Sequence, residues 1–93
     1  MTLMTIRPRL SPKVRLRFDR RTGRYLLLYP ETGLELNETA TAIVRLCTGE
    51  RTIEDIVDHL TRSYDDASRG EISGAVRKLL AVLADRGLFQ GAT

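Results

Sequence analysis

The first regular pattern in the chain is a strict alternation of charged and apolar side chains over residues 13–18. A period of two, with one apolar and one charged face, predicts a half-buried antiparallel strand. Residues 19–23 are rich in turn-forming types and end in Gly23, which tolerates a positive φ angle. Residues 24–29 are then apolar at nearly every position, which predicts the second strand of a hairpin. Because both of its faces are apolar, we expect this strand to be central, or to meet a partner with one face.

The stretch from Tyr25 to Asn37 joins this hairpin to the rest of the chain. Pro30 lacks the amide that a strand interior needs, so it ends the second strand, and a turn is predicted over residues 30–33. Residues 34–36 alternate again, but they are too few for more than a short edge strand. Asn37 is a good helix N-cap, because its side-chain oxygen can accept a hydrogen bond from a free amide of the first turn. The stretch therefore separates a sheet from helices.

Three helices are predicted after Asn37. The first ends before Gly49, a residue type that commonly stops a helix. The second and third begin with capping boxes, in which an N-cap hydroxyl and an acidic side chain three residues later exchange hydrogen bonds with the backbone. These pairs are Thr52 with Asp55 and Ser68 with Glu71. The third helix is the longest, at about residues 69–86, and Gly87 provides its stop signal.

The predicted element order is β-β-β-α-α-α, an α+β fold with a winged-helix-like arrangement. A three-stranded antiparallel sheet is followed by three helices. A chain of 93 residues suffices for one domain with one core. Residues 1–12 contain two prolines and no clear period, which predicts an extended N-terminal arm. Residues 13–90 form the single domain, and residues 91–93 are expected to fray.

Composition narrows the class of protein. A content of 42% hydrophobic and 29% charged residues is typical of a soluble globular domain. The single cysteine, Cys47, can form neither an intramolecular disulfide nor a thiolate metal site by itself. The N-terminal residues lack the apolar core of a signal peptide, and the longest apolar run, residues 26–29, is far too short to cross a membrane. We therefore expect a cytoplasmic protein that does not enter a membrane.

The net charge of +3 conceals an asymmetry along the chain. Residues 1–30 carry eight basic side chains and one acidic one, a charge of +7. Residues 31–93 carry seven basic and eleven acidic side chains, a charge of −4. A basic segment can attract nucleic acid, anionic lipid or an acidic peptide. It can equally be the solvated face of an arginine-rich strand, and charge alone does not choose between these readings.

Nothing in the sequence favours catalysis. The only histidine, His59, lies beside the apolar stripe of the second helix and far from Cys47 in the sequence, as expected for a surface or boundary side chain. Asp65 and Asp66 are adjacent acids in a predicted loop, where such pairs are usually solvated. Glycine-rich phosphate loops and paired cysteine or histidine metal motifs are absent from the sequence. We expect no catalytic residue, no metal, no cofactor and hence no enzyme.

Nucleic-acid binding is an alternative, because a small sheet with three helices resembles a winged helix. The third helix would read the DNA and offers four cations. These are Arg69, Arg77, Lys78 and Arg86. They are interrupted by Glu71 and Asp85, and most bases lie in the hairpin instead. A basic reading helix is therefore missing, and we do not expect nucleic acid as a partner.

Peptide capture is the remaining candidate. A short edge strand leaves backbone amides and carbonyls unpaired, and an extended peptide can pair with them. The third helix could form the other wall of such a groove. A helical wheel divides its side chains into a core face (Ile72, Val76, Leu79, Leu83), one flank (Ser73, Arg77, Leu80, Ala84) and the other flank (Ala75, Val82, Arg86). The first flank combines small residues, an apolar anchor and a cation, which suits a mixed apolar and acidic peptide; it could also simply cover the sheet.

The segment from Leu27 to Ile56, LLYPETGLELNETATAIVRLCTGERTIEDI, closely resembles the PqqD family of pyrroloquinoline quinone biosynthesis. Supporting marks are RLRFD at residues 15–19 and ADRGL at residues 84–88, so the resemblance covers nearly the whole chain in order. It implies a non-enzymatic peptide chaperone of the kind called a RiPP recognition element. Such a protein binds the precursor peptide PqqA and presents it to the radical SAM enzyme PqqE. The implied fold is a three-stranded sheet followed by three helices.

The resemblance also implies where the peptide binds: it adds a strand in the groove between the third strand and the third helix. The expected peptide-binding residues are Gly33, Leu34, Glu35 and Leu36 for the backbone, and Ser73, Val76, Arg77, Leu80 and Ala84 for the side chains. Thr32 and Thr48 depart from the family pattern, and both lie in turns. Related recognition elements serve other modified-peptide pathways, so a different peptide is a second reading. A monomer, or a weak homodimer through the edge strand or the arm, is expected.

Overall fold

The computed structural model describes residues 6–29 and 32–92, which form five strands and three helices. In chain order these are β1 (Arg7–Leu10), β2 (Arg15–Asp19), β3 (Arg24–Tyr29), β4 (Thr32–Leu36), α1 (Glu38–Leu46), α2 (Ile53–Ser63), α3 (Arg69–Asp85) and β5 (Phe89–Ala92). The predicted α+β fold, with three antiparallel strands followed by three helices, is confirmed. Pro30 and Glu31, the first half of the predicted turn, lie outside the described residues.

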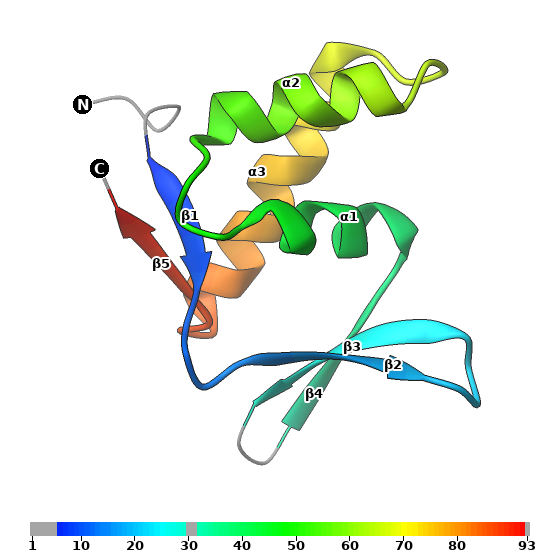
Figure 1. Ribbon diagram of the computed structural model, residues 1–93, viewed down its shortest axis with the longest axis vertical. Coiled ribbons are helices and arrows are strands. Elements are labelled where there is room, and N and C mark those ends of the chain that lie inside the picture. Colours follow the sequence, from blue (N-terminus) through cyan, green and yellow to red (C-terminus); the bar gives the residue numbers. More distant parts are fainter. Residues whose placement is uncertain (1–5, 30–31, 93) are drawn as a thin grey trace.

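The main sheet has the order β2-β3-β4 and is antiparallel throughout, so β3 is central as predicted. Its register places Leu27 of β3 between Leu16 and Leu34 of the neighbouring strands. Because paired residues share a face, these leucines form the side of the sheet that faces the core, and Leu27 is fully buried. Figure 1 shows this sheet at one side of the helices.

All three helices begin at the predicted caps. The side chain of Asn37 accepts a 2.7 Å hydrogen bond from the amide of Ala40 at the start of α1. Both capping boxes are formed, at Thr52 with Asp55 and at Ser68 with Glu71. After α3, Gly87 takes a φ of +70°, which a side-chain-bearing residue adopts only at a cost. These local signals fix where each helix starts and stops.

Strands β1 and β5 pair with each other and form a second, two-stranded sheet beside the helices (Figure 1). The sequence predicted only an extended arm for residues 1–12 and fraying after residue 90, whereas the structure pairs Arg7 with Ala92. The other edge of β1 is also held, because the carbonyl of Pro8 accepts a hydrogen bond of 3.0 Å from the amide of Gly49. A proline inside a four-residue strand hides the alternation, and the partner strand lies at the opposite end of the chain.

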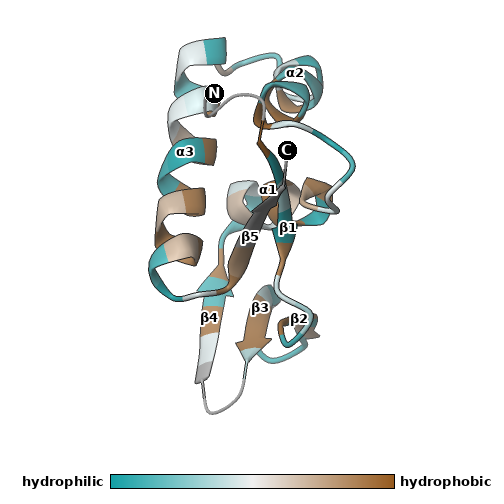
Figure 2. Cartoon of the chain, turned by 90° about the vertical axis from the view of Figure 1, so that its left-hand side faces the viewer, coloured by the Kyte–Doolittle hydropathy of each residue, from teal (hydrophilic) through white to brown (hydrophobic). Residues whose placement is uncertain are grey.

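The core lies between the inner face of the main sheet and the helices. Its buried hydrophobic side chains come from β3, β4, all three helices and the segment before β5: Leu27, Leu36, Ile43, Val44, Cys47, Ile53, Ile56, Val57, Leu60, Ile72, Val76, Leu80, Leu83 and Leu88. On α3 the buried positions are spaced by three and four residues, as in an amphipathic helix. Figure 2 shows that β4 is the strand of the main sheet that lies towards α3.

Candidate functional site

The predicted edge strand, residues 34–36, lies within β4, the last strand of the main sheet. Within the described part of the chain, β4 pairs with β3 alone. In an antiparallel edge strand, alternate residues point their amide and carbonyl away from the neighbouring strand. Leu36 is buried, Leu34 is half-buried, and the exposed Glu35 accepts a 3.3 Å hydrogen bond from Arg24. The side chains thus anchor the strand, and among residues 6–29 and 32–92 no second strand pairs with its other backbone edge.

A hollow of about 410 Å³ lies between α1 and α3, just beyond the end of β4. The residues that line it come from α1 and its N-cap (Asn37, Thr39, Ala40, Ile43) and from one flank of α3 (Ala75, Lys78, Leu79, Val82). Its floor is mainly apolar, and Lys78 adds one cation. Val82 is 37% exposed, an unusual fraction for a large apolar side chain on a packed helix. The hollow can therefore accept an apolar group together with an acidic one.

The flank of α3 predicted from the sequence lies elsewhere. Val76 is fully buried and Leu80 is only 5% exposed, so both side chains belong to the core. Arg77 and Ala84 are exposed and Ser73 is half-buried, yet none of these residues lines the hollow. On α3 the residues that line the hollow are Ala75, Lys78, Leu79 and Val82, and none of them was among the predicted peptide-binding residues. The last three lie three, four and seven positions after Ala75, so all four share one face of the helix. This helical spacing is the sequence signal that could have identified them.

The C-terminal end of α3 is tied to the central strand of the main sheet. Arg86, the residue that caps the helix, donates a 3.0 Å hydrogen bond from Nη1 to the hydroxyl of Tyr29 in β3. This contact holds the last turn of α3 beside the sheet on which β4 forms the edge. Lys78, about two turns earlier on α3, is a second basic residue and lines the hollow between α1 and α3.

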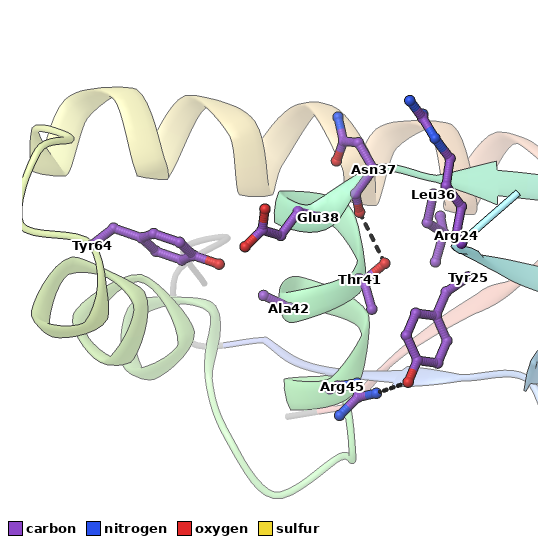
Figure 3. A pocket seen from close by; sticks show the side chains of 10 residues that line it. Arg24, Tyr25, Leu36, Asn37, Glu38, Thr41, Ala42, Arg45 and Tyr64 are labelled. Atoms are coloured by element: carbon purple, nitrogen blue, oxygen red, sulfur yellow. Dashed lines mark hydrogen bonds between the residues drawn. The ribbon is translucent and has the colours of Figure 1, made fainter. Parts of the chain in front are cut away.

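A second hollow, of about 540 Å³, lies where the tip of the β2–β3 hairpin, α1 and the end of α2 meet (Figure 3). Arg45 of α1 donates a 2.6 Å hydrogen bond to the hydroxyl of Tyr25, and its guanidinium carbon lies 4.8 Å from the centroid of that ring. Glu38 brings an opposite charge to the same hollow. Asn37 lines both hollows, so they adjoin at the N-terminus of α1.

Two ionisable side chains among the described residues have clearly shifted pKa values. Burial raises the pKa of the Cys47 thiol to about 12, so the thiol is neutral near pH 7 and is a poor nucleophile. The backbone amide of Thr52, and to a smaller extent its side chain, lower the pKa of Asp55 by hydrogen bonding. The amide of Thr52 donates to the Asp55 carboxylate in one of the two bonds of the capping box. Among residues 6–29 and 32–92, no three histidine, cysteine or acidic side chains are grouped as a metal site would require.

In the part of the chain that the structure describes, no helix combines the length and the apolar character needed to span a membrane.

Known proteins resemble this chain in both sequence and structure. The sequence model of the family described as Coenzyme PQQ synthesis protein D (PqqD) matches residues 24–88. A protein of Methylococcus capsulatus named PqqA binding protein is 42% identical over 78 residues, which cover 84% of this chain and 81% of the relative. The expectation of a binding protein rather than an enzyme is confirmed by such relatives, whose name refers to the peptide that they bind.

The most informative solved structure is the solution structure of the PqqD truncation of Methylobacterium extorquens PqqCD, described as a functional and stand-alone RiPP recognition element. It superposes with a TM-score of 0.80 at 32% identity and covers 96% of this chain and 93% of that one. Lasso peptide synthetase B1 complexed with its leader peptide has a TM-score of 0.75 at 23% identity, covering 90% and 98%, and shares the fold. With the family match extending from the start of β3 to just past the end of α3, the chain belongs to the PqqD family.

Proposed function

We propose that this chain is a cytoplasmic peptide chaperone that binds the precursor peptide PqqA and presents it to the radical SAM enzyme PqqE. The observation that carries the proposal is the open edge of β4 beside the apolar hollow on α3. An extended peptide would pair its backbone with Gly33, Leu34, Glu35 and Leu36 and so become a fourth strand of the main sheet. The names of the curated relatives support PqqA as the bound partner, and the solved relative is described as a RiPP recognition element.

The hollow on α3 would provide specificity. Backbone pairing is insensitive to sequence, whereas an apolar side chain of the peptide could enter beside Leu79 and Val82. Lys78 would then face an acidic neighbour of that anchor. Ala75 leaves room because its side chain is small. This places the peptide against the Ala75–Val82 flank of α3, whereas the sequence analysis selected the flank with Ser73, Arg77 and Ala84.

The binding step is tested by titrating ¹⁵N-labelled protein with PqqA and following the backbone amide shifts. We expect the largest shifts in β4 and at residues 75, 78, 79 and 82, and none with a scrambled peptide of the same composition. The same titration is repeated with a leader peptide from another modified-peptide pathway. Tighter binding of that peptide would assign the protein to the other pathway, while shifts at the same residues would still support the proposed binding mode. Unchanged amide signals in β4 at saturating PqqA would reject the proposed groove.

The presentation step needs its own measurement. Purified PqqE is titrated with the free chaperone and with the chaperone saturated with PqqA. We expect a ternary complex in which the peptide remains bound to the chaperone, because the peptide occupies only one edge of the sheet. Release of PqqA when PqqE is added would instead indicate competition for one surface, and presentation would then be the wrong description.

A further inference from the structure

The main sheet has a second face that the core does not use. We call it the outer face and define it by the cross-strand rows Arg15–Leu28–Gly33 and Arg17–Leu26–Glu35. Paired residues share a face, so these rows lie opposite the row Leu16–Leu27–Leu34, which faces the core. Leu26 and Leu28 belong neither to the described core nor to the side chains packed against it. Two leucines are therefore turned away from the helices.

Glycine at position 33 shapes this face. A Cβ atom placed on Gly33 would come within 3.3 Å of a terminal methyl carbon of Leu28, closer than an ordinary van der Waals contact. The side chain of Leu28 thus lies over the glycine, across β4. Leu26 and Leu28 are half-buried, so part of each side chain is accessible on this face. A hollow on the hairpin is lined by Arg17, Leu26 and Leu28 of this face together with residues 18–21.

The charges around the leucines do not cancel. Arg24 pairs with Glu35 at 3.3 Å, and Arg21 lies 3.9 Å from Asp19, so both acids of the hairpin and β4 are engaged. No ion pair is found for Arg15, Arg17 or Arg20 among the residues that the structure describes. All three side chains are exposed. The outer face is an apolar centre bordered by surplus positive charge.

Charge complementarity selects the occupant. A second copy of the chain would place arginines against arginines, and such repulsion disfavours a symmetric dimer through this face. Nucleic acid would satisfy the arginines, but leucines offer no ring on which bases stack, and Glu35 would meet phosphate. A protein surface with acidic side chains around an apolar patch satisfies both the charges and the leucines.

We propose that the outer face docks a folded protein of this kind and, resting on the proposed function, that this protein is the enzyme that modifies the bound peptide. The peptide would occupy the edge of β4 and the flank of α3, whereas the enzyme would cover the outer face. The two partners then bind different surfaces of one sheet. A ternary complex forms without displacement of the peptide.

The test compares two charge reversals of equal size, Arg17→Glu on the outer face and Arg62→Glu on the exposed surface of α2. Each variant is titrated with purified PqqE and, separately, with labelled PqqA and a random DNA duplex at low salt. We expect Arg17→Glu to weaken binding of PqqE by about tenfold or more and Arg62→Glu to leave it within about twofold. Binding of PqqA should be unchanged in both, which also shows that both variants are folded.

Each other outcome has a distinct meaning. If Arg17→Glu binds PqqE as tightly as the parent, the docking face is elsewhere and the proposal is wrong, while the chaperone function stands. If the parent binds neither PqqA nor PqqE, the proposed function fails and the docking proposal fails with it. If the parent binds the duplex and Arg17→Glu abolishes that binding, the outer face serves nucleic acid and the protein-docking proposal is rejected.

Discussion

The side chain of Arg86, the capping residue of α3, donates a 3.0 Å hydrogen bond to the hydroxyl of Tyr29, 57 positions earlier in the sequence. The contact joins the last turn of the longest helix to the central strand of the main sheet. In the proposed binding mode the peptide lies between that helix and the edge of the same sheet, so we expect this hydrogen bond to help fix the distance between the two.

Replacement of Tyr29 by phenylalanine tests this role, because it removes the hydroxyl and keeps the ring. We expect the free energy of unfolding to fall by about 0.5–1.5 kcal/mol, the usual net value of one hydrogen bond. The affinity for PqqA should also fall, by a few-fold, because α3 is held less firmly. Urea denaturation and calorimetric titration measure the two effects. Tyr64→Phe is the matched control, because no hydrogen bond from the Tyr64 hydroxyl is present within the described residues. Equal losses of stability and of PqqA affinity in both variants would show that the Arg86–Tyr29 hydrogen bond does not have this role.

A pair of lysine substitutions decides which flank of α3 meets the peptide. Val82 lines the hollow and is partly exposed, so Val82→Lys should fold normally but place a charge where an apolar anchor would sit. We expect the affinity for PqqA to fall by about tenfold or more, since loss of one apolar contact is worth on the order of 1.4 kcal/mol. Fluorescence anisotropy with labelled peptide measures this loss. Ala84→Lys, on the flank predicted from the sequence, should bind PqqA like the parent. If Ala84→Lys weakened binding and Val82→Lys did not, the peptide would instead lie on the flank predicted from the sequence.

Backbone methylation of the peptide tests strand addition without altering the protein. An added strand uses the amides of alternate residues only, because the others point away from the sheet. PqqA analogues carrying a single N-methyl group at successive positions should therefore alternate between weak and unchanged binding. Isothermal titration of each analogue gives the pattern. A smooth or random dependence on position would mean that the peptide does not bind as a β-strand.

The buried thiol of Cys47 predicts a loss of stability at high pH. Its pKa is about 12 in the folded chain against 9.0 for the unperturbed group. Above about pH 9 the unfolded chain releases this proton while the folded chain retains it, so the stability contribution is intact below pH 9 and falls as the pH rises towards 12. Urea denaturation at pH 7 and pH 10.5 should reveal a loss on the order of 2 kcal/mol from this group. The Cys47→Ala variant should lack that part of the pH dependence, and an equal pH dependence in both proteins would show that Cys47 is not its source.

Local signals explain why most of the fold could be predicted from the sequence. Alternation identified the hairpin, and three capping residues (Asn37, Thr52 and Ser68) identified the helix starts, because each acts through neighbours within a few positions. The β1–β5 sheet escaped prediction for the opposite reason. Its two strands are short, one contains Pro8, and their pairing depends on contacts between the ends of the chain.

Which flank of α3 is buried could not be predicted from the sequence. Two adjacent leucines on α3, Leu79 and Leu80, fit a helical stripe almost equally well. The sequence predicted Leu79 in the core and Leu80 on the flank. In the structure Leu80 is buried, whereas Leu79 lines the hollow between α1 and α3. Hydrophobic periodicity fixes the existence of an apolar face, but its direction depends on what packs against the helix. On α3, the other helices and β5 make that choice.

The antiparallel pairing of Arg7 with Ala92 brings the two ends of the described chain together on the side of the helices, away from the main sheet (Figure 1). A domain genetically fused to either end would thus be tethered at the same corner, clear of both the β4 edge and the outer face. The solved relative was itself cut out of a longer fusion, PqqCD, and is described as functional alone. In this chain, joining the two ends through a short loop and opening the backbone elsewhere should give a circular permutant that keeps its peptide-binding surface.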